Sequence, residues 1–299
     1  MVITMIFNKK NYKNLFYLLP ALLFIILIFL IPLSYSVVTS FTKWLLLLPN
    51  LGIKFIGIAN YVRLFTASFT WQSLGITFYF VIGAVSLELV VGFIIALALN
   101  TEFKGWKIVQ SIILIPFMMA PVVVGFVWKF ILDDNFGLVP YVLRSIGLGG
   151  VINTVPFLAN ANLAMPMIII ADAWEYIPVE TLIILAGLKS LPQEPYEAAE
   201  VDGATSFQKL VYITLPLLRP TILVAVVIRT LTCLQIFDLI FVMTGGGPGT
   251  STETLSFYGY LEAFQSYNVG FSSALNVFIL LLAMFLTVIY MKIIGGANE

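Results

Sequence analysis

The chain contains no histidine, a single cysteine and few charged residues. Only 10% of its 299 residues are charged, and a net charge of zero without a basic tract argues against nucleic-acid binding. The lone Cys233 cannot form an intrachain disulfide, and its apolar surroundings favour a packing role over redox chemistry or metal binding. The sequence also lacks a Walker-type phosphate loop, the H-E-x-x-H zinc motif and a G-x-G-x-x-G turn before a helix.

Hydrophobic residues, in contrast, make up 61% of the chain, and its mean hydropathy is +1.04. A soluble domain cannot cover so much apolar surface, so the composition predicts an integral membrane protein. A helix needs about 20 apolar residues to cross the hydrocarbon core. The sequence therefore predicts one all-α, polytopic transmembrane domain over residues 1–299, with about six helices near 15–38, 76–99, 108–132, 163–185, 217–242 and 271–294.

Lysine and arginine near the ends of these helices predict the orientation of the chain. The first apolar segment is too long for the apolar region of a signal peptide, so we expect a retained helix with its N-terminus in the cytoplasm. More basic residues then lie inside than outside. The inner ones are Lys9, Lys10, Lys13, Lys104, Lys107, Lys189, Lys209, Arg219 and Lys292, and the outer ones are Lys43, Lys54, Arg63, Lys129 and Arg144. Residues 194–216 consequently lie in the cytoplasm.

The cytoplasmic segment 194–216 is mostly polar and predicts a short helix that begins near Pro195. Proline is tolerated in a first helical turn, and Glu194, Glu197 and Glu200 suit the positive end of the helix dipole. Gly203 can adopt the left-handed conformation that ends a helix. We therefore expect a turn at this glycine.

A second helix is expected after that turn. Thr205 or Ser206 can cap its N-terminus. Pro216 and Pro220 remove backbone donors where the helix would enter the bilayer, and a bend is expected there. The segment should form a compact helix-turn-helix knob at the cytoplasmic face.

The order of residues in this knob matches a known signature. A lone Glu-Ala-Ala triplet is compatible with an ordinary polar loop, but the full spacing resembles the cytoplasmic EAA loop of ABC importer permeases. The alanines carry little side chain, so a partner surface can approach closely. The matching residues are Glu197, Ala198, Ala199, Gly203, Ile213, Leu215 and Pro216.

Three further stretches extend the resemblance over nearly the whole chain. The runs at 237–264 (FDLIFVMTGGGPGTSTETLSFYGYLEAF), 115–140 and 172–178 (DAWEYIP) are similar to sugar importer permeases of the maltose and glycerol-3-phosphate type. The similarity is to the subunit with the longer N-terminus in each permease pair. The chain lacks the additional N-terminal helices and the large outer domain of the enteric maltose permease subunit.

The resemblance implies a type I ABC importer permease fold with a cytoplasmic coupling helix, in a bacterial or archaeal cytoplasmic membrane. A second homologous permease subunit would complete the pore, and an extracytoplasmic solute-binding protein would deliver a sugar, a polyol or glycerol phosphate. Two ATP-binding subunits would hold ATP and Mg and dock on the EAA loop. The chain itself would be a transport subunit with no cofactor and no ATPase site.

Charged residues within the predicted helices are costly in a bilayer and indicate a cavity or a partner. Glu88 and Arg229 lie mid-helix, and a structural ion pair between them is the simplest interpretation. Aromatic, amide and acidic groups suit the C–H faces and hydroxyls of a sugar, although an interfacial aromatic belt would also explain the rings. The candidate substrate-pathway residues are Trp174, Tyr176, Gln235, Asp238, Glu88 and Asp172.

Two rival functions remain open on the sequence. An intramembrane enzyme would use Glu88 or Asp172 catalytically, but no nucleophile, metal set or carboxylate pair clusters with them. An ion-gradient-driven secondary transporter would use the same acids to bind protons or sodium. The glycine run at 245–247 before Pro248 lacks the lysine of a phosphate loop and predicts an irregular outer loop.

Overall fold

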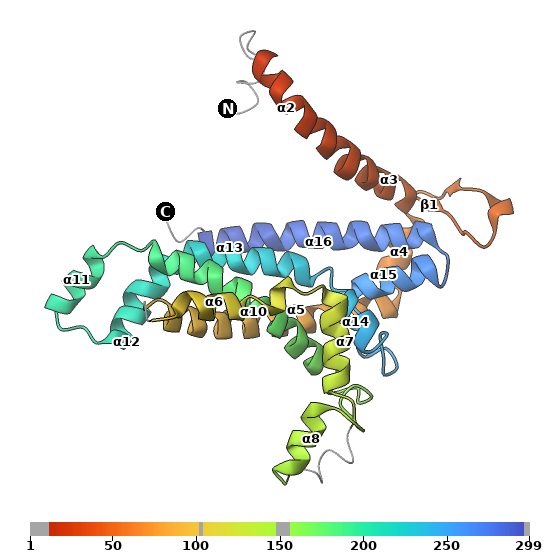
Figure 1. The fold of residues 1–299 in the computed structure, drawn as a ribbon. Helices are drawn as coiled ribbons and strands as arrows, with labels where there is room; N and C mark the ends of the chain where they lie inside the picture. Colours follow the sequence, from red (N-terminus) through yellow and green to blue (C-terminus); the bar gives the residue numbers. More distant parts are fainter. Residues whose placement is uncertain (1–11, 102–103, 148–155, 296–299) are drawn as a thin grey trace. The chain divides into compact units, whose positions relative to one another are not determined.

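The computed structural model describes residues 12–101, 104–147 and 156–295, and these residues are mostly helical (Figure 1). They divide into two compact units: residues 1–67 with 259–278, and residues 68–258 with 279–299. Four helical stretches of the described chain are long and apolar enough to cross a membrane. They are Tyr17–Ser40, Ser68–Leu99, Ser206–Cys233 and Val269–Ile293.

The smaller unit begins with α2 (Tyr12–Ile25), the π-helical turn η2 (Ile26–Leu30) and α3 (Ile31–Ser40). A two-stranded antiparallel ribbon follows, in which β1 (Thr42–Lys43) pairs with β2 (Lys54–Phe55). The remaining elements are the 3-10 turn η3 (Pro49–Leu51), α4 (Ala59–Thr66), the end of α15 (Leu255–Phe264) and the beginning of α16 (Val269–Gly295).

Polar contacts hold this unit together. The Arg63 guanidinium of α4 donates to the Glu262 carboxylate at 2.8 Å and stacks on the Phe271 ring, with its Cζ 3.8 Å from the centroid. The Asn60 amide donates to the backbone carbonyls of Ser40 and Thr42 and so fixes the entry to the ribbon.

The larger unit is built on three helices: α5 (Ser68–Leu99), α10 (Ala164–Lys189) and α13 (Leu215–Cys233) (Figure 1). Glycines let their backbones approach closely. A Cβ at Gly92 of α5 would lie 3.0 Å from the Glu180 Cβ, and one at Gly187 of α10 would lie 2.7 Å from the Thr221 side chain. The helices therefore pack around small residues, as is common for helix pairs in membranes.

Besides the beginning of α15 and the C-terminal part of α16, the remaining helices of the larger unit are short. They are α6 (Trp106–Ile113), η4 (Pro116–Met118), α7 (Pro121–Ile131), α8 (Leu138–Ser145), α11 (Glu194–Val201), α12 (Ser206–Lys209), the π turn η5 (Leu210–Thr214) and α14 (Asp238–Met243). Figure 1 places α11 and α12 together at one end of the α5, α10 and α13 group.

Two predicted helix ranges are corrected by this structure. The range 108–132 is not one helix, because Pro116 and Pro121 lack the backbone donors that a continuous helix needs, and α6 and α7 are separate. The range 217–242 is interrupted after Cys233, where Phe237 leaves helical geometry with φ −140°. The predicted range 163–185 corresponds to α10, which extends to Lys189 and carries three buried acids.

Candidate functional site

Residues 194–216 fold as the predicted helix-turn-helix, which we call the knob. Helix α11 begins at Glu194 with Pro195 in its first turn, and Glu194 and Glu197 lie at its positive end. Gly203 ends the helix with φ +78°. Its N–H donates to the Glu200 carbonyl, and the next N–H donates to the Ala199 carbonyl at 2.8 Å, which forms a Schellman motif.

The second helix of the knob is capped as expected. The Thr205 hydroxyl accepts from the backbone N–H of Gln208, and the Gln208 side chain accepts from the backbone N–H of Thr205. Beyond Lys209 the chain widens into the π turn η5, and Pro216 then opens α13. The structure thus places a π-helical turn before Pro216, and α13 continues through Pro220.

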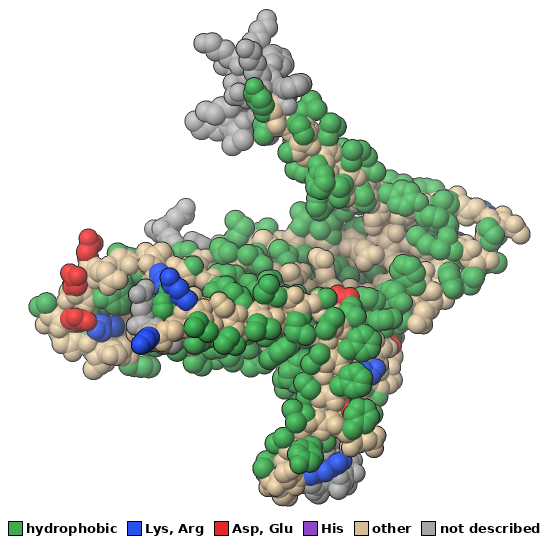
Figure 2. All heavy atoms as spheres, in the orientation of Figure 1, with side chains coloured by type: hydrophobic (Ala, Val, Ile, Leu, Met, Phe, Trp, Pro, Cys, Tyr) green, Lys and Arg blue, Asp and Glu red, His purple; other side chains and the backbone are tan. Residues whose placement is uncertain are grey.

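The signature residues differ in exposure. Glu197, Ala198 and Gly203 are exposed, whereas Ala199 is half-buried. Ile213, Leu215 and Pro216 are half-buried as well, at the junction with α13. Figure 2 shows acidic and basic side chains gathered at the end of the larger unit where α11 and α12 lie. The knob therefore presents Glu197, Ala198 and Gly203 outward, whereas Ile213, Leu215 and Pro216 are partly covered where the chain enters α13.

Two side-chain contacts join α11 to the chain that follows it. The Lys209 ammonium donates to the Glu200 carboxylate at 2.7 Å. This bond and the charge of Lys209 lower the pKa of Glu200. The Tyr196 hydroxyl lies 2.9 Å from the Thr214 hydroxyl at the end of the π turn. The sequence analysis did not single out Tyr196 or Thr214.

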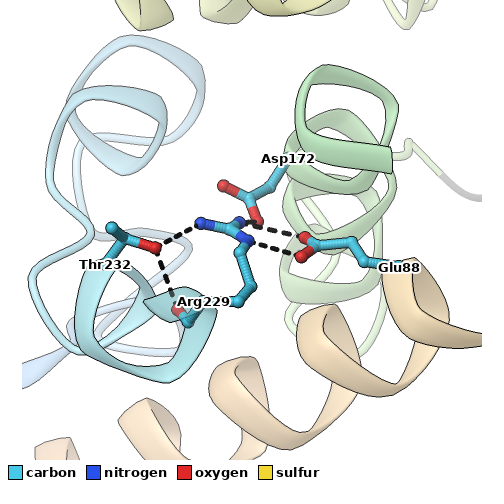
Figure 3. A network of polar contacts seen from close by, with 4 residues as sticks. All are labelled: Glu88, Asp172, Arg229 and Thr232. Atoms are coloured by element: carbon cyan, nitrogen blue, oxygen red, sulfur yellow. Dashed lines mark hydrogen bonds and ion pairs between the residues drawn. The ribbon is translucent and has the colours of Figure 1, made fainter. Parts of the chain in front are cut away.

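A charged network lies between the three long helices of the larger unit (Figure 3). Arg229 of α13 bonds the Glu88 carboxylate of α5 through Nε and through Nη2, the latter at 2.9 Å. Its Nη2 also bonds Asp172 of α10, and its Nη1 donates to Thr232 at 2.8 Å. The three charged residues are at most 4% exposed. The expected pair between Glu88 and Arg229 is present, and Asp172 joins it.

A cavity of about 100 Å³ adjoins this network. Its charged, amide and aromatic lining includes Asp172, Glu175, Tyr176, Arg229, Gln235 and Asp238. One oxygen of Glu175 is buried and has no hydrogen-bond partner among the described residues. Four of the six candidate substrate-pathway residues thus line one cavity: Asp172, Tyr176, Gln235 and Asp238.

The other two candidates do not line the cavity. Glu88 is completely buried behind it, where it bonds Arg229. Trp174 is 37% exposed and packs edge-on against Trp128 of α7, with ring centroids 6.2 Å apart. Successive positions along a helix point in different directions, which explains why Trp174 and Tyr176 have different surroundings.

The glycine run forms an irregular loop, as expected. Gly245 and Gly246 have positive φ, and a Cβ at Gly246 would lie 2.7 Å from the Phe257 ring. The Thr252 hydroxyl donates to the Gly247 carbonyl at 2.9 Å and closes the loop. The glycines thus allow the positive φ angles of this loop and the close approach of Gly246 to the Phe257 ring.

The family of binding-protein-dependent transport system inner membrane components matches residues 88–296. The chain belongs to this family. The knob, the charged network and the cavity all lie within the larger unit of this permease. The permease is thus a multi-pass membrane protein of ABC importers, and the resemblance inferred from the sequence is confirmed.

Curated relatives align over most of the permease. It is 35% identical over 279 residues to the trehalose/maltose transport system permease protein MalF of Thermococcus litoralis, covering 92% of this chain and 91% of that one. It is 36% identical over 277 residues to the sulfoquinovosyl glycerol transport system permease protein SmoG of Agrobacterium fabrum, covering 93% and 88%.

Solved structures share the fold of the permease. A bacterial ABC transporter involved in the import of the acidic polysaccharide alginate contains a chain that matches with a TM-score of 0.81 and 24% identity, covering 100% of this chain and 99% of that one. The alginate transporter in complex with an alginate pentasaccharide-bound periplasmic protein matches with a TM-score of 0.79 and 24% identity, covering 95% of both chains.

Proposed function

We propose that this permease is the transmembrane subunit of an ATP-driven, binding-protein-dependent importer of sugars or related polyols, and that it forms half of the translocation pore. The observation that carries the proposal is the knob, which places the complete EAA signature on a capped helix-turn-helix that continues directly into α13. Helix α13 carries Arg229 beside the cavity, so force applied to the knob reaches the pathway along one helix.

The partners of this subunit follow from the same proposal. A second homologous permease subunit completes the pore, and two ATP-binding subunits receive the EAA loops. An extracytoplasmic solute-binding protein delivers the solute to the opposite face. ATP binding closes the nucleotide subunits and moves the knob, which turns the cavity outward, and hydrolysis resets it. The N-terminus and the knob lie in the cytoplasm.

The exposed surface of the knob suits an ATP-binding partner. Val201 is 89% exposed and Phe207 is 72% exposed, and both lie next to the exposed signature residues. Apolar side chains that remain exposed beside small residues are typical of a protein contact. Ala198 allows the closest approach because its side chain is a single methyl group.

The cavity suits a hydroxylated solute. Carboxylate and amide oxygens accept hydrogen bonds from sugar hydroxyls, and the Tyr176 ring can pack on the C–H face of a sugar. Glu175 contributes a buried oxygen that lacks a partner among the described residues, and Gln235 and Asp238 are at least partly exposed. The relatives named for trehalose, maltose and sulfoquinovosyl glycerol support a carbohydrate or glycoside as the solute.

A crosslinking experiment tests the proposal. We expect Ala198→Cys, in a Cys233→Ser background, to trap an ATP-binding chain in native membranes. The matched control is Asn135→Cys, which is also exposed but lies on the opposite side of the predicted membrane, and it should trap none. Failure of Ala198→Cys to trap such a chain, when the variant is expressed at the level of the control, would refute docking at the knob.

Transport measurements separate the proposal from the secondary-transporter alternative. The complex co-purified from native membranes should give vanadate-sensitive, ATP-dependent uptake in vesicles. Its bound solute can be identified on the associated binding protein. Uptake driven by a proton or sodium gradient in the absence of ATP would instead establish a secondary transporter.

A further inference from the structure

The contacts of α11 within the knob fall on one face of this helix. Tyr196 and Glu200 are four residues apart, and residues with this spacing lie above one another on a helix. Each contacts a different residue of the following chain: Tyr196 lies 2.9 Å from the Thr214 hydroxyl, and Glu200 accepts from Lys209 at 2.7 Å. Helix α11 is therefore held at two points, one helical turn apart.

The two partners come into register because of the π turn. Lys209 and Thr214 are five residues apart, and in a regular α-helix this step would rotate them by about 140°. The wider π turn η5 closes with a bond from the Leu215 N–H to the Leu210 carbonyl and brings them towards a common face. The extra residue in this turn thus aligns Lys209 and Thr214 with Glu200 and Tyr196.

The Thr214 hydroxyl has two polar partners within the knob. The Thr214 hydroxyl donates its single proton to the Lys209 carbonyl at 3.3 Å, inside the π turn. The same hydroxyl lies 2.9 Å from the Tyr196 hydroxyl, with which it shares a second hydrogen bond. This contact links α11 to the backbone of the π turn through one buried threonine, which is 6% exposed.

Space beneath α11 makes these two contacts important. A cavity of about 250 Å³ is lined by Tyr196, Glu200 and Thr214 and by residues at the ends of α5 and α10, among them Leu97, Asn100 and Leu188. A helix above such a space can tilt when its polar contacts are lost. The Lys209–Glu200 pair is exposed and contributes little by itself, so the Tyr196–Thr214 contact, in which the threonine is buried, is the stronger attachment.

We propose that Tyr196 and Thr214 are positioning residues for energy coupling: their hydrogen bond holds α11 on the π turn so that the knob and α13 move as one rigid body. The inference rests on the proposed function of the knob. Arg229 lies about 20 Å along α13 from the π turn, so a rigid attachment transmits a displacement of the knob to the cavity. If the attachment is loose, α11 tilts and the displacement of the knob does not reach the cavity.

The test uses the importer complex purified from native membranes and reconstituted in vesicles, with radiolabelled trehalose and maltose as probes. We expect Tyr196→Phe and Thr214→Val to lower the uptake per ATP hydrolysed by roughly tenfold, with subunit assembly unchanged. Thr214→Ser keeps the hydroxyl and should restore coupling. Tyr79→Phe is the matched control, because Tyr79 lies on α5 outside the knob with 54% exposure and should behave as wild type.

A second readout requires no solute. Spin labels at Asp202→Cys and Arg219→Cys, in a Cys233→Ser background, report the distance between the knob and α13. This distance should be the same before and after trapping with ATP and vanadate. In Tyr196→Phe it should change or broaden on trapping.

The outcomes distinguish the inference from the function on which it rests. If the wild-type complex shows no ATP-dependent uptake and no crosslink at Ala198, the proposed function is wrong. If the wild type transports with ATP while Tyr196→Phe and Thr214→Val keep its coupling ratio and spin-label distance, only the inference is overturned. The double variant should be no worse than either single variant, because all three lack the same bond, and additive losses would also overturn it.

Discussion

Arg229 lies over the ring of Tyr176, with its Cζ 3.7 Å from the ring centroid. The same guanidinium bonds Glu88 and Asp172, so it joins three helices and forms one wall of the cavity. A buried arginine with two carboxylates and an aromatic ring satisfies its charge internally. The same residue thus links the three helices and lines the cavity.

Removal of Arg229 is expected to destabilise the permease strongly. In Arg229→Met the buried carboxylates of Glu88 and Asp172 lose their counter-charge, which should cost about 3–5 kcal/mol. Thermal unfolding in detergent measures the loss. Arg219→Met, an exposed position on the same helix, is the control and should unfold as wild type. Equal melting temperatures for the two variants would contradict the structural role of the network.

Gly203→Val is expected to reduce the coupling of uptake to ATP hydrolysis, because it strains the backbone of the knob. A Cβ at this glycine would meet no atom within 4 Å, so the cost comes from φ +78° alone and should be about 1–2 kcal/mol. Uptake and ATP hydrolysis in vesicles measure the effect, and uptake should fall relative to hydrolysis. Gly203→Asn should be milder, since asparagine tolerates the left-handed conformation. Normal uptake by Gly203→Val would exclude a mechanical role for this turn.

Substitutions in the cavity are expected to change solute preference. Asp238→Asn and Gln235→Ala remove groups that line the cavity and should alter the relative uptake of different sugars several-fold, by about 1 kcal/mol of lost hydrogen bonding. Trp174→Phe should leave the preference unchanged because Trp174 packs against Trp128. Competition assays with sugars of different stereochemistry provide the measurement. A shift in Trp174→Phe alone would place the pathway elsewhere.

The Glu200–Lys209 contact is expected to weaken only in acid. Lys209 lowers the pKa of Glu200, so this contact stabilises the knob at pH values above the ordinary glutamate pKa and is lost as the pH falls through the lowered value. Thermal stability of wild type and Glu200→Gln should therefore differ near neutral pH and converge in strong acid. A difference that persists in acid would mean that Glu200 acts through something other than its charge.

The knob was predictable because single residues determine where its helices begin and end. Pro195, Gly203 and Thr205 each act on their own turn of backbone, and the structure confirms a helix start, a left-handed end and a cap at these positions. The π turn was not predictable in the same way. Its register depends on contacts between α11 and the following chain, such as the one from Tyr196 to Thr214.

The transmembrane pattern was predicted less well. Hydropathy counts apolar residues and ignores missing backbone donors, so it joined α6 and α7 across Pro116 and Pro121. The participation of Asp172 in the Arg229 network is a tertiary contact between α10 and α13. A single sequence gives no distance between helices, and so it identified Glu88 and Arg229 as partners without the third member.

The bonding of Arg229 has a consequence for what can pass the cavity. Four of its five N–H donors are directed at Glu88, Asp172 and Thr232, and the acids Glu175 and Asp238 are among the other lining residues. A phosphorylated sugar would meet these acids beside an arginine whose charge is already balanced by two carboxylates, and its entry should be disfavoured. We therefore expect that phosphorylation of an imported sugar in the cytoplasm would prevent its escape back through this pore.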